Sequence, residues 1–330
     1  MALDSSENTS EAMSVIAGLI GSDAGGIPLE QYIQCALYHP RIGYYMRHGE
    51  RVGRSPDTDF YTASSIKGLF PRLVLESIRS LLDEPLSEYV FVEAGPESAG
   101  GILGNLPDHP FKDICLIRPG DPFEIPEKAI VFSNELFDAQ PFRRFVRHAG
   151  SWMEAGVTIR AGSLASTLLE AENLPELPED APEGYTIDWP QRANNLLREI
   201  AGKSWRGLFI SFDYGLDRRT LFTERPEGTG RTYSSHTMGS DLLDRPGEID
   251  ITCHVVWDVM ESILTENRFQ NVELSRQESF FMHYSQIAIR EILESSPAGF
   301  SPQKQSLMEL LNPGNMGHLF QVLSARRNDF

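Results

Sequence analysis

Apolar residues recur with helical spacing in three segments near the start of the chain, residues 10–22, 28–40 and 66–84. Ser10 stands before the apolar part of the first segment as a suitable N-cap, and Pro71 lies near the start of the third. This spacing predicts a mostly helical leader over residues 1–85.

Further along the chain, the apolar residues gather in continuous runs, at 89–94, 113–117, 129–133 and 207–212. These runs do not alternate strictly between apolar and polar residues, and helical segments such as 190–201 lie between them. Both features are typical of a parallel sheet that helices cover on both faces. We therefore expect one α/β domain over residues 86–330.

Two features predict an insertion in this domain. Residues 142–159 have the pattern of a β-hairpin that turns at an Ala-Gly-Ser sequence, and a loop rich in Pro and Glu follows at 174–184. We expect an inserted β-hairpin region at about 142–190. The C-terminal part is expected to form a helix over 306–311 and a last strand over 318–327.

The charge of the chain narrows the classes of partner. The chain has 330 residues, of which 41% are hydrophobic and 23% charged, an ordinary composition for a globular protein. Its 29 basic and 47 acidic residues give a formal charge of −18. Phosphate binding needs a basic face, so this charge argues against a nucleic-acid partner and favours cationic partners such as Arg-rich peptides. Alternatively, the acidity only keeps the protein soluble.

Cysteine usage and the N-terminus bear on location. Cys35, Cys115 and Cys253 are far apart and have no Cys-x-x-Cys spacing, which argues against zinc and favours a reducing compartment. The first ten residues are acidic and polar, unlike a signal peptide, and no apolar run approaches the roughly 20 residues that span a membrane. We therefore expect a cytoplasmic protein that does not insert into a membrane.

A glycine-containing turn follows the apolar run 89–94, in the sequence Phe-Val-Glu-Ala-Gly-Pro-Glu-Ser-Ala-Gly-Gly. It resembles the first strand–turn–helix of a Rossmann-like nucleotide site, where glycines let the backbone approach a ligand and helix N–H groups bind it. Glu97 would repel a pyrophosphate, which disfavours NAD and ATP, but it would not repel the cationic S-adenosylmethionine. Alternatively, the turn is only structural.

Two carboxylates and an amide follow the next apolar run, as Asn134, Glu135 and Asp138. Buried, unpaired carboxylates cost several kcal/mol, so this segment is either a paired structural corner or a place where chemistry happens. Glu135 and Asp138 are three residues apart, so a helical turn after the strand would place them on one side.

Seven short motifs follow one another along nearly the whole chain: ALYHPRIGYY (36–45), TDFYTASSI (58–66), SNELFDAQP (133–141), DYG (213–215), GTGRTYSSH (228–236), PGEIDITCHV (246–255) and NPGNMGHLFQVL (312–323). Each motif alone is weak, whereas the ordered set is specific. Together they resemble the motifs of the MidA-like family of S-adenosylmethionine-dependent methyltransferases, whose mitochondrial members assist the assembly of respiratory complex I.

The resemblance implies a Rossmann-like methyltransferase fold and S-adenosylmethionine as the cofactor. It also implies a protein substrate that presents arginine, because mitochondrial members symmetrically dimethylate an arginine of a complex I subunit. The residues expected to bind the cofactor are Asp59, Thr62, Glu93, Gly95, Gly100, Gly101 and Asn134. The expected catalytic residues are Glu135, Asp138, His236 and His254.

The chemistry of arginine explains this choice of catalytic residues. A guanidinium is protonated and delocalised, so its nitrogens are poor nucleophiles. Glu135 and Asp138 could bind it through a bidentate fork and aim one nitrogen at the methyl group. His236 or His254 would take the released proton, with a pKa near the working pH.

Structural alternatives stay open for several residues: a helix cap (Asp138), a surface loop (His236), a core position (His254) and a loop-closing pair (Asp250 with Thr252). Tyr44 and Tyr45 are either core residues or aromatic contacts for a guanidinium. Asp59 and Thr62 either belong to a lid over the cofactor or cap the third helix.

The chain also departs from the family pattern. Glu97 stands in the glycine turn. Arg118 stands where the family has an acidic residue that holds the ribose hydroxyls, and Asp121 could replace that acid only if the turn brings it back to the end of the strand. Residues 117–129 are too few for the usual helix and third strand. These departures favour the alternative function, a catalytically inactive assembly factor with a methyltransferase fold that binds a partner protein. A dehydrogenase is disfavoured because no suitable acid follows about 20 residues after the turn.

Overall fold

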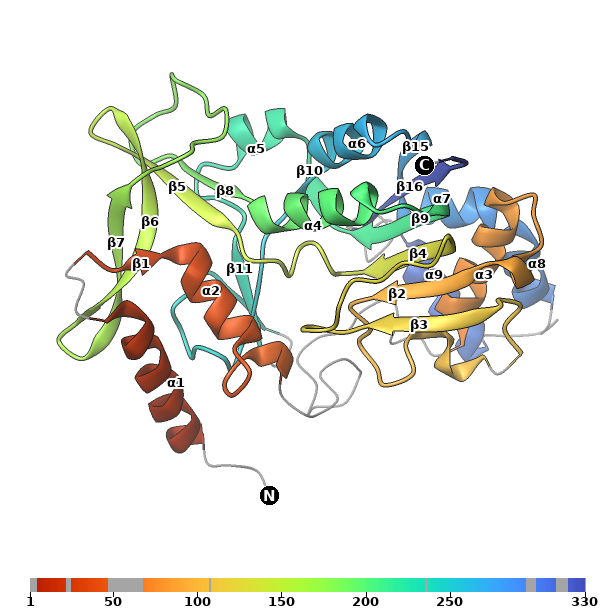
Figure 1. Ribbon diagram of the computed structural model, residues 1–330, viewed down its shortest axis with the longest axis horizontal. Helices are drawn as coiled ribbons and strands as arrows, with labels where there is room; N and C mark the ends of the chain where they lie inside the picture. The colour runs from red at the N-terminus through yellow and green to blue at the C-terminus, as the bar shows by residue number, and fades with distance from the viewer. Residues whose placement is uncertain are drawn as a thin grey trace. The chain divides into compact units, whose positions relative to one another are not determined.

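The structure is a computed structural model of the chain, and it describes residues 5–21, 25–46, 68–106, 108–234, 237–294, 301–312 and 320–329 (Figure 1). These residues belong to two compact units. The first unit comprises Met1–Gly49, Phe137–Asn195 and Leu216–Asp258, and the second comprises Glu50–Leu136, Leu196–Gly215 and Val259–Phe330.

The second unit contains a six-stranded sheet with the strand order β15-β16-β9-β4-β2-β3 (Figure 1). Its strands are β2 (Val90–Ala94), β3 (Asp113–Ile117), β4 (Lys128–Asn134), β9 (Arg206–Asp213), β15 (Gln270–Arg276) and β16 (Gln321–Arg327). Strands β2, β3, β4 and β9 run parallel, and β16 is antiparallel to both β9 and β15. The continuous apolar runs therefore form neighbouring parallel strands, as predicted.

Both faces of this sheet are buried. One face packs against helices α3 (Leu69–Leu81), α7 (Gln277–Tyr284), α8 (Gln286–Glu294) and α9 (Pro302–Leu311). Phe70 of α3 lies edge-on to Phe212 of β9, with 5.2 Å between the ring centroids. Val131, Phe209 and Leu323 point to the opposite face and are also buried. The predicted α/β class, with a parallel sheet covered on both faces, is confirmed.

The connections around β3 are short. Residues 118–127 join β3 to β4 without a helix or strand, as the length of this segment predicted. The resemblance to a strand–turn–helix predicted a helix after the glycine turn, and this prediction is wrong, because only a 3₁₀ turn forms there, Ile102–Asn105. Gly100, Gly101 and Gly104 disfavour a longer helix, since glycine loses the most backbone freedom on folding.

The first unit contains an antiparallel five-stranded sheet with the order β1-β6-β5-β8, in which β7 also pairs with β6. Its strands are β1 (Ile27–Pro28), β5 (Arg143–His148), β6 (Ser151–Arg160), β7 (Ser163–Glu170) and β8 (Thr186–Trp189). The predicted hairpin is confirmed as β5 and β6, which turn at Ala149 and Gly150, both with positive φ.

The remaining elements are α1 (Ser5–Ile20), α2 (Leu29–Tyr38), α4 (Gln191–Gly202), α5 (Arg218–Glu224), α6 (Trp257–Glu266), β10 (Gly215–Leu216), β11 (Arg231–Ser234), β12 (Thr237–Gly239), β13 (Asp250–Thr252), β14 (Val255–Val256) and the 3₁₀ turns Tyr44–Met46 and Leu86–Glu88. Because α1 begins at Ser5, Ser10 lies inside the helix and the predicted N-cap is wrong.

The three helices expected in the leader all form, but they do not share one unit. Helices α1 and α2 belong to the first unit, whereas α3 belongs to the second. The expected division into a leader over residues 1–85 and a methyltransferase domain over 86–330, with an insertion at about 142–190, stays a prediction. Across the described ranges, none of the helices combines the length and apolar character needed to cross a membrane.

Candidate active site

The carboxyl ends of β2 and β4 define the candidate cofactor site in the second unit. Strand β2 lies between β3 and β4, so the chain leaves β2 to one side and then returns to its other side. In open α/β sheets, ligands bind outside the carboxyl ends of the strands at such a change of direction. Glu93 in β2 and Asn134, the last residue of β4, both lie at this edge.

Glu93 and the glycine turn are in direct contact. Glu93 is 3% exposed, and its Oε2 accepts a hydrogen bond from the backbone N–H of Ile102 at 2.8 Å. A Cβ on Gly101, which has φ +63°, would lie 2.2 Å from this Oε2. Only glycine therefore allows the turn to approach the carboxylate so closely.

The environment of Glu93 favours its protonated form. The pKa of the Glu93 carboxyl is raised to about 7, mainly by burial and in smaller part by the nearby charge of Glu97. The N–H of Ile102 and the guanidinium of Arg118 act in the opposite direction. Glu93 is thus half-ionised near neutral pH, which is a perturbation typical of functional sites.

Two more glycines shape the turn. Gly95 has φ +71°, and a Cβ there would lie 2.8 Å from Cδ1 of Leu136. A Cβ on Gly100 would lie 3.0 Å from Cα of Gly104. A side chain at Gly95, Gly100 or Gly101 would therefore clash with the turn's own surroundings, so these glycines allow the turn to pack closely. Their role in binding a ligand stays a prediction.

Asn134 connects β4 to the turn. Its side chain is 5% exposed, and Nδ2 donates to Oε1 of Glu97 at 2.9 Å and to Oε1 of Glu135 at 3.2 Å. Within the part of the chain that the structure describes, Oδ1 of Asn134 is buried and has no hydrogen-bond partner. A buried acceptor without a partner is costly, so this atom points to a missing donor.

Glu135 has a strained backbone. Its φ is +51°, a region that costs a non-glycine residue about 1–2 kcal/mol. Its N–H donates to the carbonyl of Phe212 at 2.9 Å, which continues the β4–β9 pairing one residue past the strand. Strain of this kind clusters at active sites, so it supports a functional role for Glu135.

The segment after β4 is not helical. Residues 135–140 form bends and a turn, in which the N–H of Gln140 donates to the carbonyl of Phe137 at 3.3 Å. The positive φ of Glu135 prevents a helix from starting there. The predicted helical turn over Glu135 and Asp138 is therefore wrong, and so is the alternative in which Asp138 caps a helix.

The end of β3 carries Arg118 in place of the expected acid. Its Nη2 donates to the carbonyl of Ala99 in the glycine turn at 2.6 Å. The carboxylate of Asp121 accepts from the backbone N–H of Arg118 at 2.8 Å. The turn therefore does bring Asp121 back to the end of β3, where the ribose-binding acid was expected.

In the first unit, aromatic rings and carboxylates gather around Tyr45. The rings of Tyr38 and Tyr45 stack with their centroids 5.3 Å apart, and Tyr44 lies edge-on to Tyr45 at 5.2 Å. The hydroxyl of Tyr45 donates to Oδ1 of Asp250 at 2.8 Å. Burial raises the pKa of Tyr45 well above its usual value, and the charges of Asp250 and Asp138 add to this effect.

We call this group the Tyr45 cluster; it comprises Tyr38, Tyr44, Tyr45, Asp138 and Asp250. Both of its carboxylates are buried, since Asp138 is 2% exposed and Asp250 is 3% exposed. The backbone carbonyl of Asp138 accepts from the N–H of Cys253 at 2.9 Å, which holds it beside β13. Sequence reasoning missed Tyr38, although it lies in the motif that contains Tyr44 and Tyr45. It treated Asp250 only as a possible partner of Thr252.

His254 lies half-buried after β13, and its N–H donates to Oγ1 of Thr229 at 3.3 Å. Burial lowers the pKa of its imidazole to about 4, and the charges of Arg225 and Arg231 lower it as well. The expectation of a pKa near the working pH is therefore wrong for His254, which is neutral at pH 7. The expected site residues His236, Asp59 and Thr62 lie outside the described residues.

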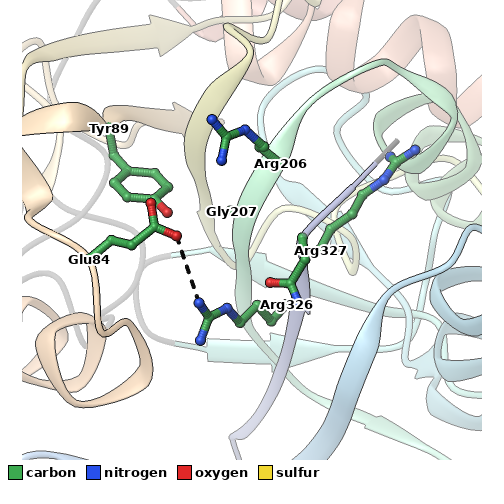
Figure 2. A pocket seen from close by; sticks show the side chains of 7 residues that line it. Glu84, Tyr89, Arg206, Gly207, Arg326 and Arg327 are labelled. Atoms are coloured by element: carbon green, nitrogen blue, oxygen red, sulfur yellow. Dashed lines mark ion pairs between the residues drawn. The ribbon is translucent and has the colours of Figure 1, made fainter.

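A cavity of about 260 Å³ lies at the end of the second unit's sheet that is opposite to the carboxyl ends of β2 and β4 (Figure 2). It is lined by Glu84, Tyr89, Arg206, Gly207, Arg326, Arg327 and Asn328. Arg326 faces Glu84, as the dashed line in Figure 2 shows, and Nη1 of Arg327 donates to the carbonyl of Ala201 at 2.7 Å. The guanidinium groups thus have partners in the same unit, which is consistent with a structural role.

Comparisons with known proteins bear on the fold and the family. A family model described as "Putative S-adenosyl-L-methionine-dependent methyltransferase" matches residues 68–273. A crystal structure of a Burkholderia thailandensis protein bound to S-adenosyl-homocysteine superimposes with a TM-score of 0.86 at 23% identity, covering 99% of this chain and 94% of that one.

A native crystal structure from Burkholderia thailandensis gives a TM-score of 0.84 at 23% identity, again with 99% and 94% coverage. Among curated protein sequences, none matches this chain significantly. At this identity the two crystal structures show the fold alone, which is that of a methyltransferase with a Rossmann-like sheet. Because the matched residues are more than half of its length, the chain belongs to this family of S-adenosyl-L-methionine-dependent methyltransferases, as its MidA-like motifs predicted.

Proposed function

We propose that this protein binds S-adenosylmethionine at the carboxyl ends of β2 and β4 and methylates arginine in a protein substrate. The observation that carries the cofactor site is the buried Oδ1 of Asn134 beside the glycine turn, which has no hydrogen-bond partner in the described ranges. A ligand with several N–H donors would satisfy this acceptor, and the ammonium of S-adenosylmethionine is such a group.

The residues at this edge fit the cofactor in shape and charge. The absence of side chains at Gly95 and Gly101 leaves the turn close to β2, and Glu93 anchors it through Ile102. Glu93, Gly95, Gly100, Gly101 and Asn134 would hold the cofactor, which supplies an electrophilic methyl group. Asp59 and Thr62 are further proposed cofactor ligands on the basis of the motif alone.

A cationic substrate is supported by the Tyr45 cluster. Aromatic faces attract guanidinium groups, and buried carboxylates favour a cation over a neutral ligand. Asp138 and Asp250 both act electrostatically on Tyr45, which places two carboxylates near the stacked rings. The formal charge of −18 also suits a basic protein partner.

On the basis of the motif alone, the carboxylates of Glu135 and Asp138 are proposed to bind the guanidinium nitrogens. When one nitrogen gains a methyl group, a proton must leave it. His236 and His254 are the proposed acceptors. His254 is neutral at pH 7 and can accept a proton, although a pKa of about 4 makes it a weak base.

A second candidate function is an assembly factor that has lost catalysis. Its support is the contact between Arg118 and Ala99, which places a guanidinium where the family has an acid. Under both functions, we propose a protein partner and a cytoplasmic location, since the cysteines are few and widely spaced. The two functions differ in one respect, which is transfer of the methyl group.

Incubation with methyl-labelled S-adenosylmethionine and a library of arginine-containing peptides, each paired with its lysine counterpart, tests the proposal. We expect methylarginine in the arginine peptides, detected by mass spectrometry, and no label in the lysine peptides. Label on lysine would contradict the substrate class. Cofactor binding without transfer to any peptide or to whole-cell protein would favour the assembly factor.

A further inference from the structure

Glu97 stands in the glycine turn, in a position that the fold does not require to be acidic. It is half-buried, and its Oε1 accepts a hydrogen bond from Nδ2 of Asn134 at 2.9 Å. Glu97 follows β2 and Asn134 ends β4, so the bond joins the two strands at which the chain changes direction in the sheet. The carboxylate therefore reaches the place where a ligand of this sheet would bind.

The hydrogen bond fixes how the amide of Asn134 is oriented. Nδ2 is directed to the carboxylates of Glu97 and Glu135, so Oδ1 is the atom left without a partner among the described residues. Because Asn134 is 95% buried, water does not freely satisfy this oxygen. A carboxylate and an amide oxygen are thus neighbours, and a single cationic N–H donor group could bind both.

The surrounding charges favour a cation as well. Glu93, Glu97 and Glu135 lie around the turn, and the charge of Glu97 raises the pKa of Glu93. The guanidinium of Arg118, which follows β3, donates to the carbonyl of Ala99. The carboxylate of Glu97 would attract a cationic group of a ligand and repel a pyrophosphate.

We propose that Glu97, together with Oδ1 of Asn134, binds the ammonium of the amino-acid portion of the cofactor. This inference rests on the proposed function, since it assumes that the cofactor binds at β2 and β4. Glu97 is then a specificity-determining residue: it selects ligands whose amino-acid end is positively charged.

Calorimetric titration of wild-type protein and Glu97→Gln with three ligands tests this role. S-adenosylhomocysteine carries the ammonium and the carboxylate, its deaminated analogue keeps only the carboxylate, and 5′-methylthioadenosine lacks both. Glu294→Gln is the matched control, because it removes the same charge at the exposed end of α8 in the same unit. Thermal unfolding of each variant checks that the fold is intact.

We expect Glu97→Gln to lower the affinity for S-adenosylhomocysteine at least about tenfold, because a charge-assisted hydrogen bond to the ammonium is lost. The affinity for 5′-methylthioadenosine should stay the same. The deaminated analogue should bind Glu97→Gln no more weakly than it binds the wild-type protein. Equal loss for all three ligands, or no loss for S-adenosylhomocysteine, would overturn the role of Glu97. If wild-type protein bound none of the ligands, the proposed function itself would fail.

Discussion

Glu93 and Gly101 approach so closely that a Cβ on Gly101 would lie 2.2 Å from Oε2 of Glu93. The same oxygen accepts the N–H of Ile102, so the carboxylate holds the end of the glycine turn against β2. The shape of the candidate cofactor site depends on this contact, since Gly101 also has a φ of +63° that side chains rarely adopt.

Substitution Gly101→Ala should therefore destabilise the protein by about 2–4 kcal/mol, from the strained φ and from the clash with the carboxylate. It should also lower the affinity of the protein for S-adenosylhomocysteine. Chemical unfolding measures the first effect and calorimetry the second. Gly104→Ala is the control, because a Cβ there would have no atom within 4 Å, and a change of less than about 0.5 kcal/mol is expected. Equal effects of the two substitutions would contradict the role of the Glu93–Gly101 contact.

Stability should depend on the ionisation of Glu93. Its pKa is raised from 4.5 to about 7 on folding, so the folded state holds its proton more tightly than the unfolded state. The stability that this carboxyl contributes is complete below pH 4.5 and is lost as the pH rises through 7. Glu93→Gln cannot ionise and can still accept from Ile102.

The stability of Glu93→Gln relative to wild type should therefore rise across this range by up to about 3 kcal/mol. Urea unfolding of both proteins at pH 5 and pH 8 gives the difference. A difference that does not change with pH would mean that Glu93 titrates normally.

Glu135→Gln should leave folding and S-adenosylhomocysteine binding nearly unchanged while it lowers methyl transfer to arginine peptides at least about a hundredfold. The reason is that an amide can neither balance the charge of the guanidinium nor bind it as a carboxylate does. The rate of methylarginine formation is the measurement, with Glu294→Gln as a charge-matched control. Transfer at the wild-type rate would refute the assignment of Glu135.

Tyr45→Phe should destabilise the protein by about 1–2 kcal/mol, because Oδ1 of the buried Asp250 would lose the hydroxyl that donates to it at 2.8 Å. The matched control is Tyr284→Phe. It removes an exposed hydrogen bond of the same 2.8 Å length, in which the hydroxyl of Tyr284 donates to Glu273. Water can replace that bond, so the control should change little. If the control were as costly as Tyr45→Phe, burial of Asp250 would not be the cause.

The four parallel strands were predictable because each is a continuous apolar run, a pattern typical of buried parallel strands. The proximity of Glu93, Gly101 and Asn134 was predictable for the same reason, since the carboxyl ends of parallel strands share an edge of the sheet. The hairpin β5–β6 was also correct, because its strands and turn are local in sequence. Strand β15 (Gln270–Arg276) was not predicted, because it is mostly polar and lies at the edge of the sheet.

Other features depend on tertiary contacts that a pattern does not contain. The helix expected after the glycine turn was replaced by a 3₁₀ turn, because the glycines disfavour a helix and the turn is held by the buried carboxyl of Glu93. The positive φ of Glu135 depends on its bond to Phe212 in β9, and the low pKa of His254 depends on burial and on two arginines. The Tyr45 cluster joins residues more than 200 positions apart, such as Tyr45 and Asp250.

The central claim is that this chain binds S-adenosylmethionine at the carboxyl ends of β2 and β4. Calorimetric titration of the wild-type protein with S-adenosylmethionine, S-adenosylhomocysteine and NADH tests it most directly. We predict micromolar binding of the first two and none of NADH, whose pyrophosphate Glu97 would repel. Absence of binding by both S-adenosyl compounds would contradict the claim and would leave the carboxylates of this edge as structural residues.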